Sequence, residues 1–256
     1  MYEEILYSVA DLVATITLNR PDRLNAWTPR MEAEVRAAIN AASNDENARA
    51  IVITGAGRGF CAGYDMSLLD VEDKFVGNND NFGRRFSYLL TVPKPIFVAI
   101  NGAIAGFALC FGVFGDFRYM AEGAKLTTAF AKRGLIAEEG IAWMLPRLIG
   151  TPNALDLLCS ARVIEAKEAE VLGLVRTLPA EGFLAAVQEI AREMVTAASP
   201  RSIGVIKRQI YNSYFQSLAE ACEMADAESQ AAGNSEDYKE GVAHFMEKRS
   251  PKFTGR

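Results

Sequence analysis

The stretch "IVITGAGRGFCAGYD", residues 51–65, decides the fold, because it joins a β-branched apolar run to a glycine-rich turn. The run Ile51–Thr54 leads directly into Gly55, Gly57 and Gly59. A dinucleotide-binding βαβ unit begins in the same way, with glycines between a strand and a helix. A lone glycine triplet is a weak signal, so the following residues must discriminate between a phosphate loop and another kind of backbone site.

Those residues argue against dinucleotide binding. That fold requires a helix directly after the glycines and an acidic residue at the end of the next strand. The sequence "CAGYDMSLLDVEDKFVGNNDN" at 61–81 predicts at most a short helical turn, followed by a polar stretch. The Y-x-x-x-K pattern of short-chain reductases and the G-x-S-x-G pattern of hydrolases are also absent. We therefore interpret the glycines as allowing backbone N–H groups to approach a ligand carbonyl.

Composition excludes several classes of protein. A chain of 256 residues that is 50% hydrophobic can bury a full core. Its 27 basic and 32 acidic side chains leave a net charge of −5, which gives no overall positive field for nucleic acid. The N-terminus lacks a basic leader segment, and no stretch approaches the roughly 18 apolar residues of a membrane span. We expect a cytoplasmic protein with neither nucleic acid nor membrane as partner.

Cysteine and histidine are too sparse for a typical zinc site. The four cysteines form no C-x-x-C pair, and His244 is the only histidine. Catalytic zinc usually takes several such ligands, so we predict no metal site. We expect the cysteines to be buried free thiols and His244 to be a packing or surface residue.

Hydrophobic periodicity predicts the order of the elements. Alternation over residues 5–18 predicts two strands with a turn at Ala10–Asp11, and Thr28 followed by proline predicts the start of an amphipathic helix. Further predicted elements are strands at 50–54 and 96–102, a helix near 80–91 and short strands over 118–129. Beyond about residue 145 the sequence is mainly helical. We expect a core domain over 1–198 and a helical C-terminal region over 199–256.

The chain resembles the crotonase, or enoyl-CoA hydratase/isomerase, superfamily almost from end to end. Seven segments stand in the family's order: "LNRPDRLNAW" (18–27), "IVITGAGRGFCAGYDM" (51–66), "KPIFVAINGAIAG" (94–106), "LPRLIG" (145–150), "EAKEAEVLGLV" (165–175), "SPRSIGVIK" (199–207) and "EDYKEGVAHFMEKRSPKFTGR" (236–256). The resemblance implies an α/β fold, a spiral of ββα units forming two sheets. It also implies a helical C-terminal region that builds homotrimers, often paired as hexamers.

The resemblance further implies an acyl-CoA thioester substrate whose enolate is stabilised by two backbone N–H groups. By the patterns A-G-x-D and N-G-x-x-x-G-G, these donors are the amides of Tyr64 and Phe107. Phe107 stands where the family commonly has glycine, so its side chain narrows the site. The neighbours assigned to the substrate site are Ala62, Asp65, Met66 and Gly106; Asp65, like Asp116, is expected to fix a loop.

Coenzyme A would enter only as part of the substrate, with no other cofactor. The resemblance places Arg23 near its phosphates and Leu24 and Ala26 along its adenine. It places Lys252 and Phe253 of the C-terminal tail near the pantetheine or phosphates. The alternative to phosphate binding is that Arg23 is only a solvent-exposed charge in a loop.

The acid/base residues depart from those of the family's hydratases, which use two glutamates. The matching positions are Cys110 and Phe130, and neither side chain can replace a carboxylate. Spacing to "LPR" instead matches Glu138 to the single glutamate with which enoyl-CoA isomerases move a proton between C2 and C4. Such a base needs apolar neighbours that raise its pKa, here expected to be Leu135, Ile136, Ala137, Ile141 and Trp143.

These residues favour a one-base enoyl-CoA isomerase with Glu138 as the base. A hydratase that uses Glu138, with Glu139 and a positioned water, is the runner-up. A non-catalytic acyl-CoA-binding homologue is the contrasting class. Phe107, Phe130 and Trp143 indicate an acyl pocket crowded by aromatic side chains, while chain length and pathway stay open.

Overall fold

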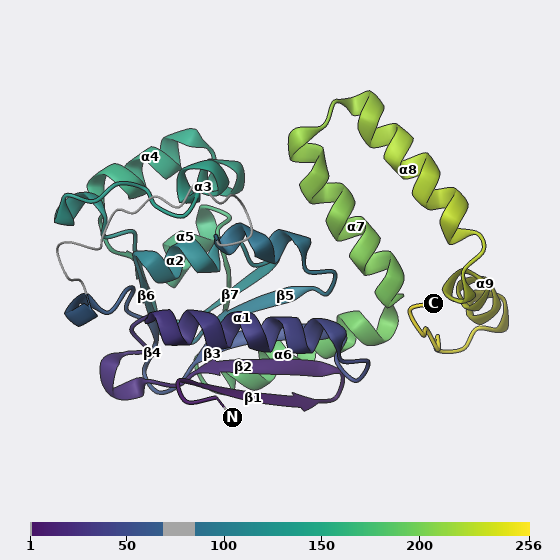
Figure 1. Cartoon of the computed structure of the whole chain (residues 1–256), viewed down its shortest axis with the longest axis horizontal. Coiled ribbons are helices and arrows are strands. Elements are labelled where there is room, and N and C mark those ends of the chain that lie inside the picture. The colour runs from purple at the N-terminus through teal and green to yellow at the C-terminus, as the bar shows by residue number, and fades with distance from the viewer. Residues whose placement is uncertain (1, 69–84) are drawn as a thin grey trace.

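The computed structural model describes residues 2–68 and 85–256. Its main body is a mixed α/β core, and three helices near the C-terminus extend from that core as an arm (Figure 1). The polar stretch that follows the glycine turn, over 70–81, and the start of the helix predicted near 80–91 lie outside the described residues.

The larger sheet of the described chain has six strands in the order β1-β2-β3-β5-β7-β10. These strands are β1 (Ile5–Ala10), β2 (Val13–Leu18), β3 (Ala50–Gly55), β5 (Ile96–Ile100), β7 (Phe117–Ala121) and β10 (Arg176–Leu178). β1 and β2 are antiparallel, and every other neighbouring pair is parallel. β3 and β5 are buried along their whole length, as expected for strands covered on both faces.

A smaller sheet of four described strands has the order β4-β6-β8-β9. These strands are β4 (Gly59–Cys61), β6 (Ala103–Ala105), β8 (Lys125–Thr127) and β9 (Ile164–Glu165). The glycine turn after β3 thus leads into a short strand of this second sheet, not into a helix. The interpretation against a dinucleotide loop is therefore confirmed.

The helices of the main body follow one another in chain order. They are α1 (Pro29–Asn44), α2 (Phe107–Gly112), α3 (Ile141–Ile149), α4 (Thr151–Ser160), α5 (Ala166–Val171) and α6 (Phe183–Ala197). The Thr28 side chain caps α1 by accepting a hydrogen bond from the Met31 N–H, as predicted. α1 packs on β1 and β2, and α6 packs on β2, β3 and β5.

The arm consists of α7 (Pro200–Asn212), α8 (Leu218–Ala232) and α9 (Glu236–Glu247) (Figure 1). Helix α8 buries none of its residues, and its Leu218 is 82% exposed. Ile206, Ile210 and Phe215 on the same arm are also more than half exposed. The arm therefore presents an apolar surface that this single chain does not cover.

Most of the predicted elements are present, with some differences in detail. The helix predicted near 80–91 is, in its described part, the 3₁₀ helix η3 (Phe86–Thr91). Cys61 and Cys110 are buried, but Cys159 and Cys222 are exposed, so the prediction of buried thiols was wrong for these two. No helix within residues 2–68 and 85–256 has the length and apolar character needed to cross a membrane.

Candidate active site

The Tyr64 amide is left free by the way its segment pairs with Trp27. In this parallel bridge the Trp27 N–H donates to the Gly63 carbonyl at 2.7 Å, and the Asp65 N–H donates to the Trp27 carbonyl at 2.9 Å. Both bonds are thus made by the neighbours of Tyr64, whose own N–H faces the opposite side. Between described residues, the Tyr64 N–H donates no hydrogen bond.

The Phe107 amide is free because it begins helix α2. Gly106, at φ +51°, precedes the helix, and its carbonyl accepts from the N–H groups of Leu109 and Cys110. The first amides of a helix have no partner within the helix. Within the described part of the chain, Phe107 N–H also has no backbone acceptor.

Gly63 allows these two segments to approach closely. At φ +98° it has a conformation that L-residues rarely adopt, and a Cβ added there would lie 2.9 Å from the Ala105 carbonyl oxygen and 3.7 Å from the Phe107 nitrogen. The backbone next to Tyr64 is therefore packed directly against the start of α2. Two unpartnered N–H groups on adjacent segments are what an oxyanion hole requires.

Aromatic side chains surround these amides. The Phe107 ring lies 5.6 Å from the Tyr64 ring and 4.9 Å from the Phe86 ring, measured between centroids. Beneath it Trp27, Phe86 and Phe111, here called the aromatic floor, are at most 1% exposed and contact one another. Tyr64 and Phe107 themselves are only partly buried.

Glu138 and Glu139 lie in a strained turn beside the same helix. Glu139 and Gly140 are both left-handed, at φ +51° and +80°, directly before α3. The Cys110 thiol lies 3.5 Å from the Glu138 carbonyl oxygen. Cys110 and Phe107 are three residues apart and share one face of α2, so the turn lies close to the predicted hole.

Both carboxyl groups of this turn are half-buried. Burial raises the pKa of Glu138 above its ordinary value. Burial likewise raises the pKa of Glu139, against the opposing effect of the Arg85 charge. Burial also raises the pKa of the Cys110 thiol, and the negative charges of Glu138 and Glu139 raise it further. Both carboxylates therefore lie close to α2. The predicted apolar surroundings are present in part, since Ile141 is buried but Ile136 is 75% exposed, contrary to the expectation.

The segment predicted to hold coenzyme A lies along the same edge. The Leu24 carbonyl accepts from the Ala62 N–H at 3.0 Å, so Leu24 and Ala26 run beside Ala62 and Tyr64. Arg23 is exposed at the end of η1 (Pro21–Arg23), where a phosphate can reach it. Met66 is 56% exposed at the start of η2 (Met66–Leu68).

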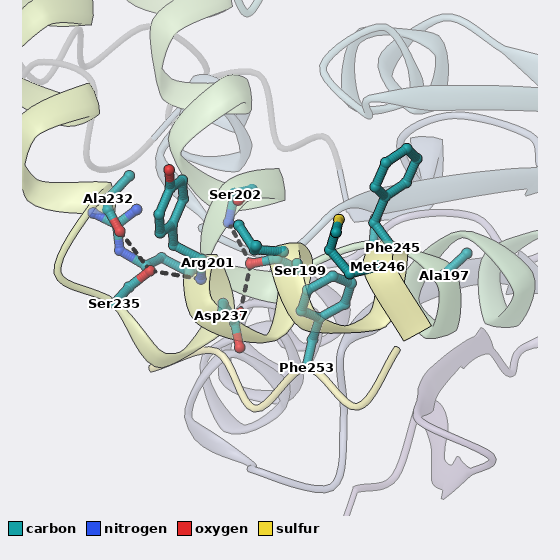
Figure 2. Close-up of a pocket in the computed structure, with 14 residues that line it drawn as sticks. Ala197, Ser199, Arg201, Ser202, Ala232, Ser235, Asp237, Phe245, Met246 and Phe253 are labelled. Carbon is teal, nitrogen blue, oxygen red and sulfur yellow. Dashed lines mark hydrogen bonds between the residues drawn. The ribbon is translucent and has the colours of Figure 1, made fainter. Parts of the chain in front are cut away.

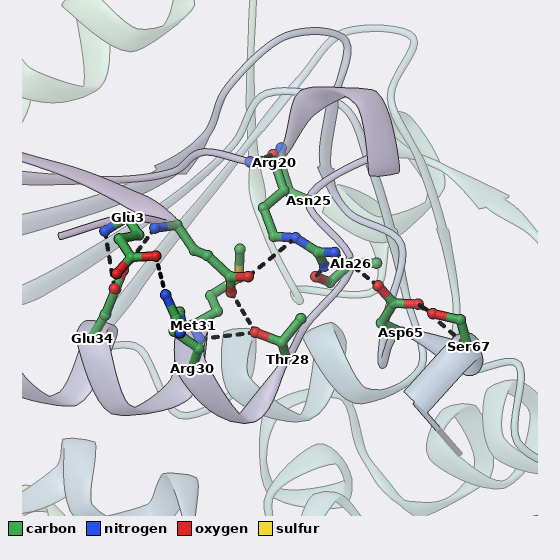
Figure 3. A network of polar contacts seen from close by, with 11 residues as sticks. Glu3, Arg20, Asn25, Ala26, Thr28, Arg30, Met31, Glu34, Asp65 and Ser67 are labelled. Atoms are coloured by element: carbon green, nitrogen blue, oxygen red, sulfur yellow. Dashed lines mark hydrogen bonds and ion pairs between the residues drawn. The ribbon is translucent and has the colours of Figure 1, made fainter. Parts of the chain in front are cut away.

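Two residues that the sequence analysis did not single out fix this edge. The Arg20 guanidinium donates to the Ala26 carbonyl and to Asp65, as Figure 3 shows. The buried Asn25 amide donates to the carbonyls of Ala56, Gly59 and Phe60. Asp65 also accepts from the Ser67 hydroxyl, and this contact agrees with the loop-fixing role expected for it.

Three predicted residues lie away from this group. Trp143 stacks on Phe215 and contacts Tyr214, which are in η5 (Ser213–Phe215) of the arm. The Phe253 carbonyl accepts from Arg49, at the beginning of β3, whereas Arg23 lies beyond the end of β3. Since six residues of strand span about 20 Å, Lys252 and Phe253 do not join Arg23 within one chain.

Phe130 lies in the core and is 3% exposed. The preceding residue, Ala129, lies close to Gly106, because its Cβ would be 4.0 Å from a Cβ added at Gly106.

Two cavities in the described structure lie apart from this site. The first, about 480 Å³, is enclosed by the beginning of α7, by α9 and by Phe253 of the tail (Figure 2). At its base the buried Asp237 accepts from the Ser199 hydroxyl and from the N–H groups of Thr254 and Gly255. The second, about 340 Å³, lies beside Asp116 and Lys207. Of the predicted site residues, only Phe253 lines either cavity.

Comparisons with known proteins show the family of the chain. The family model "Enoyl-CoA hydratase/isomerase" matches residues 9–256. The chain is 35% identical to the 1,2-epoxyphenylacetyl-CoA isomerase of Escherichia coli K12, with all of both chains covered. It is 31% identical to a protein of Rhodobacter capsulatus described as a probable enoyl-CoA hydratase, covering 100% of this chain and 99% of the relative.

Solved structures give the same result. An enoyl-CoA hydratase from Bacillus anthracis superposes with a TM-score of 0.88 at 28% identity, covering 99% of this chain and 100% of the other. The α/β crotonase-type fold expected from the sequence is therefore confirmed. The chain belongs to the enoyl-CoA hydratase/isomerase family of the crotonase superfamily.

Proposed function

We propose that the protein is a one-base enoyl-CoA isomerase. The observation that carries this proposal is that two backbone amides without a hydrogen-bond partner among the described residues, those of Tyr64 and Phe107, lie beside the turn that contains the half-buried Glu138. The two positions that match the glutamates of the family's hydratases are Cys110 and Phe130, both buried and without a carboxylate. This combination supports enolate chemistry with a single proton carrier.

In the proposed reaction the thioester oxygen of a 3-enoyl-CoA accepts both N–H groups. The Glu138 carboxylate removes a proton from C2, and the negative charge is delocalised onto the thioester oxygen, where the two amides stabilise it. Protonated Glu138 then returns the proton to C4, so that the double bond lies between C2 and C3. A carboxylate whose pKa is raised by burial is a stronger base than one in water, which favours the first step.

The proposal includes how the substrate and other copies bind. Coenzyme A, carried by the substrate, runs along Arg23, Leu24 and Ala26, and the reaction needs no further cofactor. Lys252 and Phe253 reach coenzyme A from the tail of another copy in a trimer or hexamer, since within one chain they lie at the other end of β3. The exposed apolar side chains of α7 and η5 support such an assembly, which we place in the cytoplasm.

A hydratase is the second candidate, and Glu139 favours it. Its left-handed backbone is a conformation that a glutamate adopts only at a cost, and such strain often occurs at functional sites. The pKa of both adjacent carboxyl groups is raised by burial. Together they could hold and activate a water that adds across a 2-enoyl-CoA.

Turnover of two substrates separates these candidates. A 3-enoyl-CoA is followed for double-bond migration and a 2-enoyl-CoA for water addition, with the wild type, Glu138→Gln and the exposed control Glu181→Gln. The proposal predicts migration that falls by about 100-fold or more in Glu138→Gln and is unchanged in the control. Hydration that survives Glu138→Gln would overturn both the reaction and the base. Acyl-CoA binding without any turnover would indicate a non-catalytic homologue.

A further inference from the structure

The ring of Phe107 packs against three other aromatic rings next to its own amide. It contacts Phe86 edge-on at 4.9 Å and Trp27 at 6.1 Å, both belonging to the aromatic floor. The floor residues are at most 1% exposed, and because protein interiors are close-packed, moving the Phe107 ring toward them requires them to repack. Its other neighbour is the Tyr64 ring, at 5.6 Å and 77°.

The two residues that supply the free amides thus also supply two adjoining, partly exposed rings. A thioester carbonyl bound between the amides has its acyl carbon within one side-chain length of both rings. Coenzyme A leaves along Leu24 and Ala26, which pair with the Ala62 segment. The acyl group must therefore pack against the aromatic surface on the other side of the carbonyl.

Resting on the proposed function, we propose that Phe107 and Tyr64 form the wall of the acyl site and select short, flat acyl groups, aryl groups above all. Aromatic rings pack favourably edge-to-face or offset at the centroid distances already found among these side chains. A long straight chain, in contrast, has to displace the Phe107 ring from the aromatic floor. Phe107 is thus the residue that sets acyl specificity, through its side chain and not only through its amide.

Binding of two unreactive thioesters tests this wall without requiring turnover. Benzoyl-CoA and octanoyl-CoA carry acyl groups of similar carbon number but different shape, and neither has a double bond to move or hydrate. Their dissociation constants are measured by calorimetry for the wild type, Phe107→Ala and the milder Phe107→Leu. Leu6→Ala, at an exposed apolar residue of β1, is the control.

The wild type should bind benzoyl-CoA at least 10-fold more tightly than octanoyl-CoA. Phe107→Ala should remove or reverse that preference, Phe107→Leu should weaken it, and Leu6→Ala should retain it. The proposed wall of the acyl site is wrong if the wild type prefers octanoyl-CoA, or if Phe107→Leu and Phe107→Ala keep the wild-type ratio of the two dissociation constants. The proposed function stands in either case. If neither thioester binds the wild type, the proposed function itself fails.

Discussion

Two regions of the molecule place polar groups in apolar surroundings: the candidate active site, and the contact that holds helix α7 to the core. Only the second region gives its polar groups hydrogen-bond partners. In this α7 anchor, Asp116 accepts from the Lys207 ammonium at 2.7 Å, the Tyr211 hydroxyl at 2.9 Å and the Ile96 N–H at 2.7 Å. Lys207 also donates to the Leu89 and Lys94 carbonyls. The amides of Tyr64 and Phe107 have no such partners between described residues.

This difference separates structural from chemical roles. A buried polar group with all its partners stabilises one arrangement of the chain, whereas a free donor near a half-buried carboxylate remains available to a ligand. Changes in the α7 anchor should therefore lower stability first. Changes in the candidate active site should lower activity while the fold remains.

Lys207→Met should give the largest effect, and on stability. It leaves the buried Asp116 without its cation, and breaking a buried pair in this way costs about 3–5 kcal/mol. Urea denaturation measures the loss in free energy of unfolding. The control Lys167→Met removes a lysine whose side chain is 83% exposed in its pair with Glu170, and the free energy of unfolding should change by no more than about 0.5 kcal/mol. Equal losses in both variants would show that the anchor does not hold the arm.

Gly63→Ala should affect activity most directly. Its Cβ would lie 2.9 Å from the Ala105 carbonyl oxygen, so the segment must shift and move the Tyr64 amide relative to that of Phe107. Loss of one oxyanion donor lowers kcat by about 100-fold or more. Gly123→Ala is the matched control, because Gly123 is also left-handed, at φ +78°, but has nothing within 4 Å of the added Cβ. If both variants keep wild-type kcat, the amides are not the catalytic donors.

The pH dependence of Glu138 should give the smallest effect. Its pKa is raised by burial in the folded state, so the charged form destabilises the fold above that pKa, and this cost disappears as the pH falls below it. Glu138→Gln should therefore raise the Tm at neutral pH, by no more than about 2 °C, and match the wild type near pH 4. Wild-type kcat/KM should fall over the same acid range as Glu138 is protonated. A lower Tm for Glu138→Gln at neutral pH would contradict the assigned burial.

Local patterns in the sequence were enough to predict much of the fold. The alternation over 5–18 and the Thr28 cap depend on neighbours in the chain. Both strands and the cap are confirmed, but the predicted turn at Ala10–Asp11 was wrong by one residue, because Ala10 pairs with Val13 and the turn lies at Asp11–Leu12. Asn25 was missed because a polar residue in a loop is typical of an exposed turn, whereas here its buried amide joins three carbonyls. Tertiary contacts of this kind leave no periodic signal.

The same limit applies to the candidate site. Matching motifs predicted that Tyr64 and Phe107 lie together, and the structure brings their backbones and rings into contact. The motifs did not predict that Trp143 packs on Phe215 of the arm, or that Ile136 is exposed. These positions depend on how distant segments pack, which the spacing along one chain does not encode.

Exchange of the C2 protons of butyryl-CoA in D₂O, followed by NMR, tests the central claim most directly. It reports enolate formation at the thioester whether the enzyme goes on to isomerise or to hydrate. The account predicts exchange with the wild type that slows by about 100-fold or more in Glu138→Gln and is little changed in Glu139→Gln. Exchange that survives in Glu138→Gln, or that is absent with a wild type that binds the thioester, would contradict it.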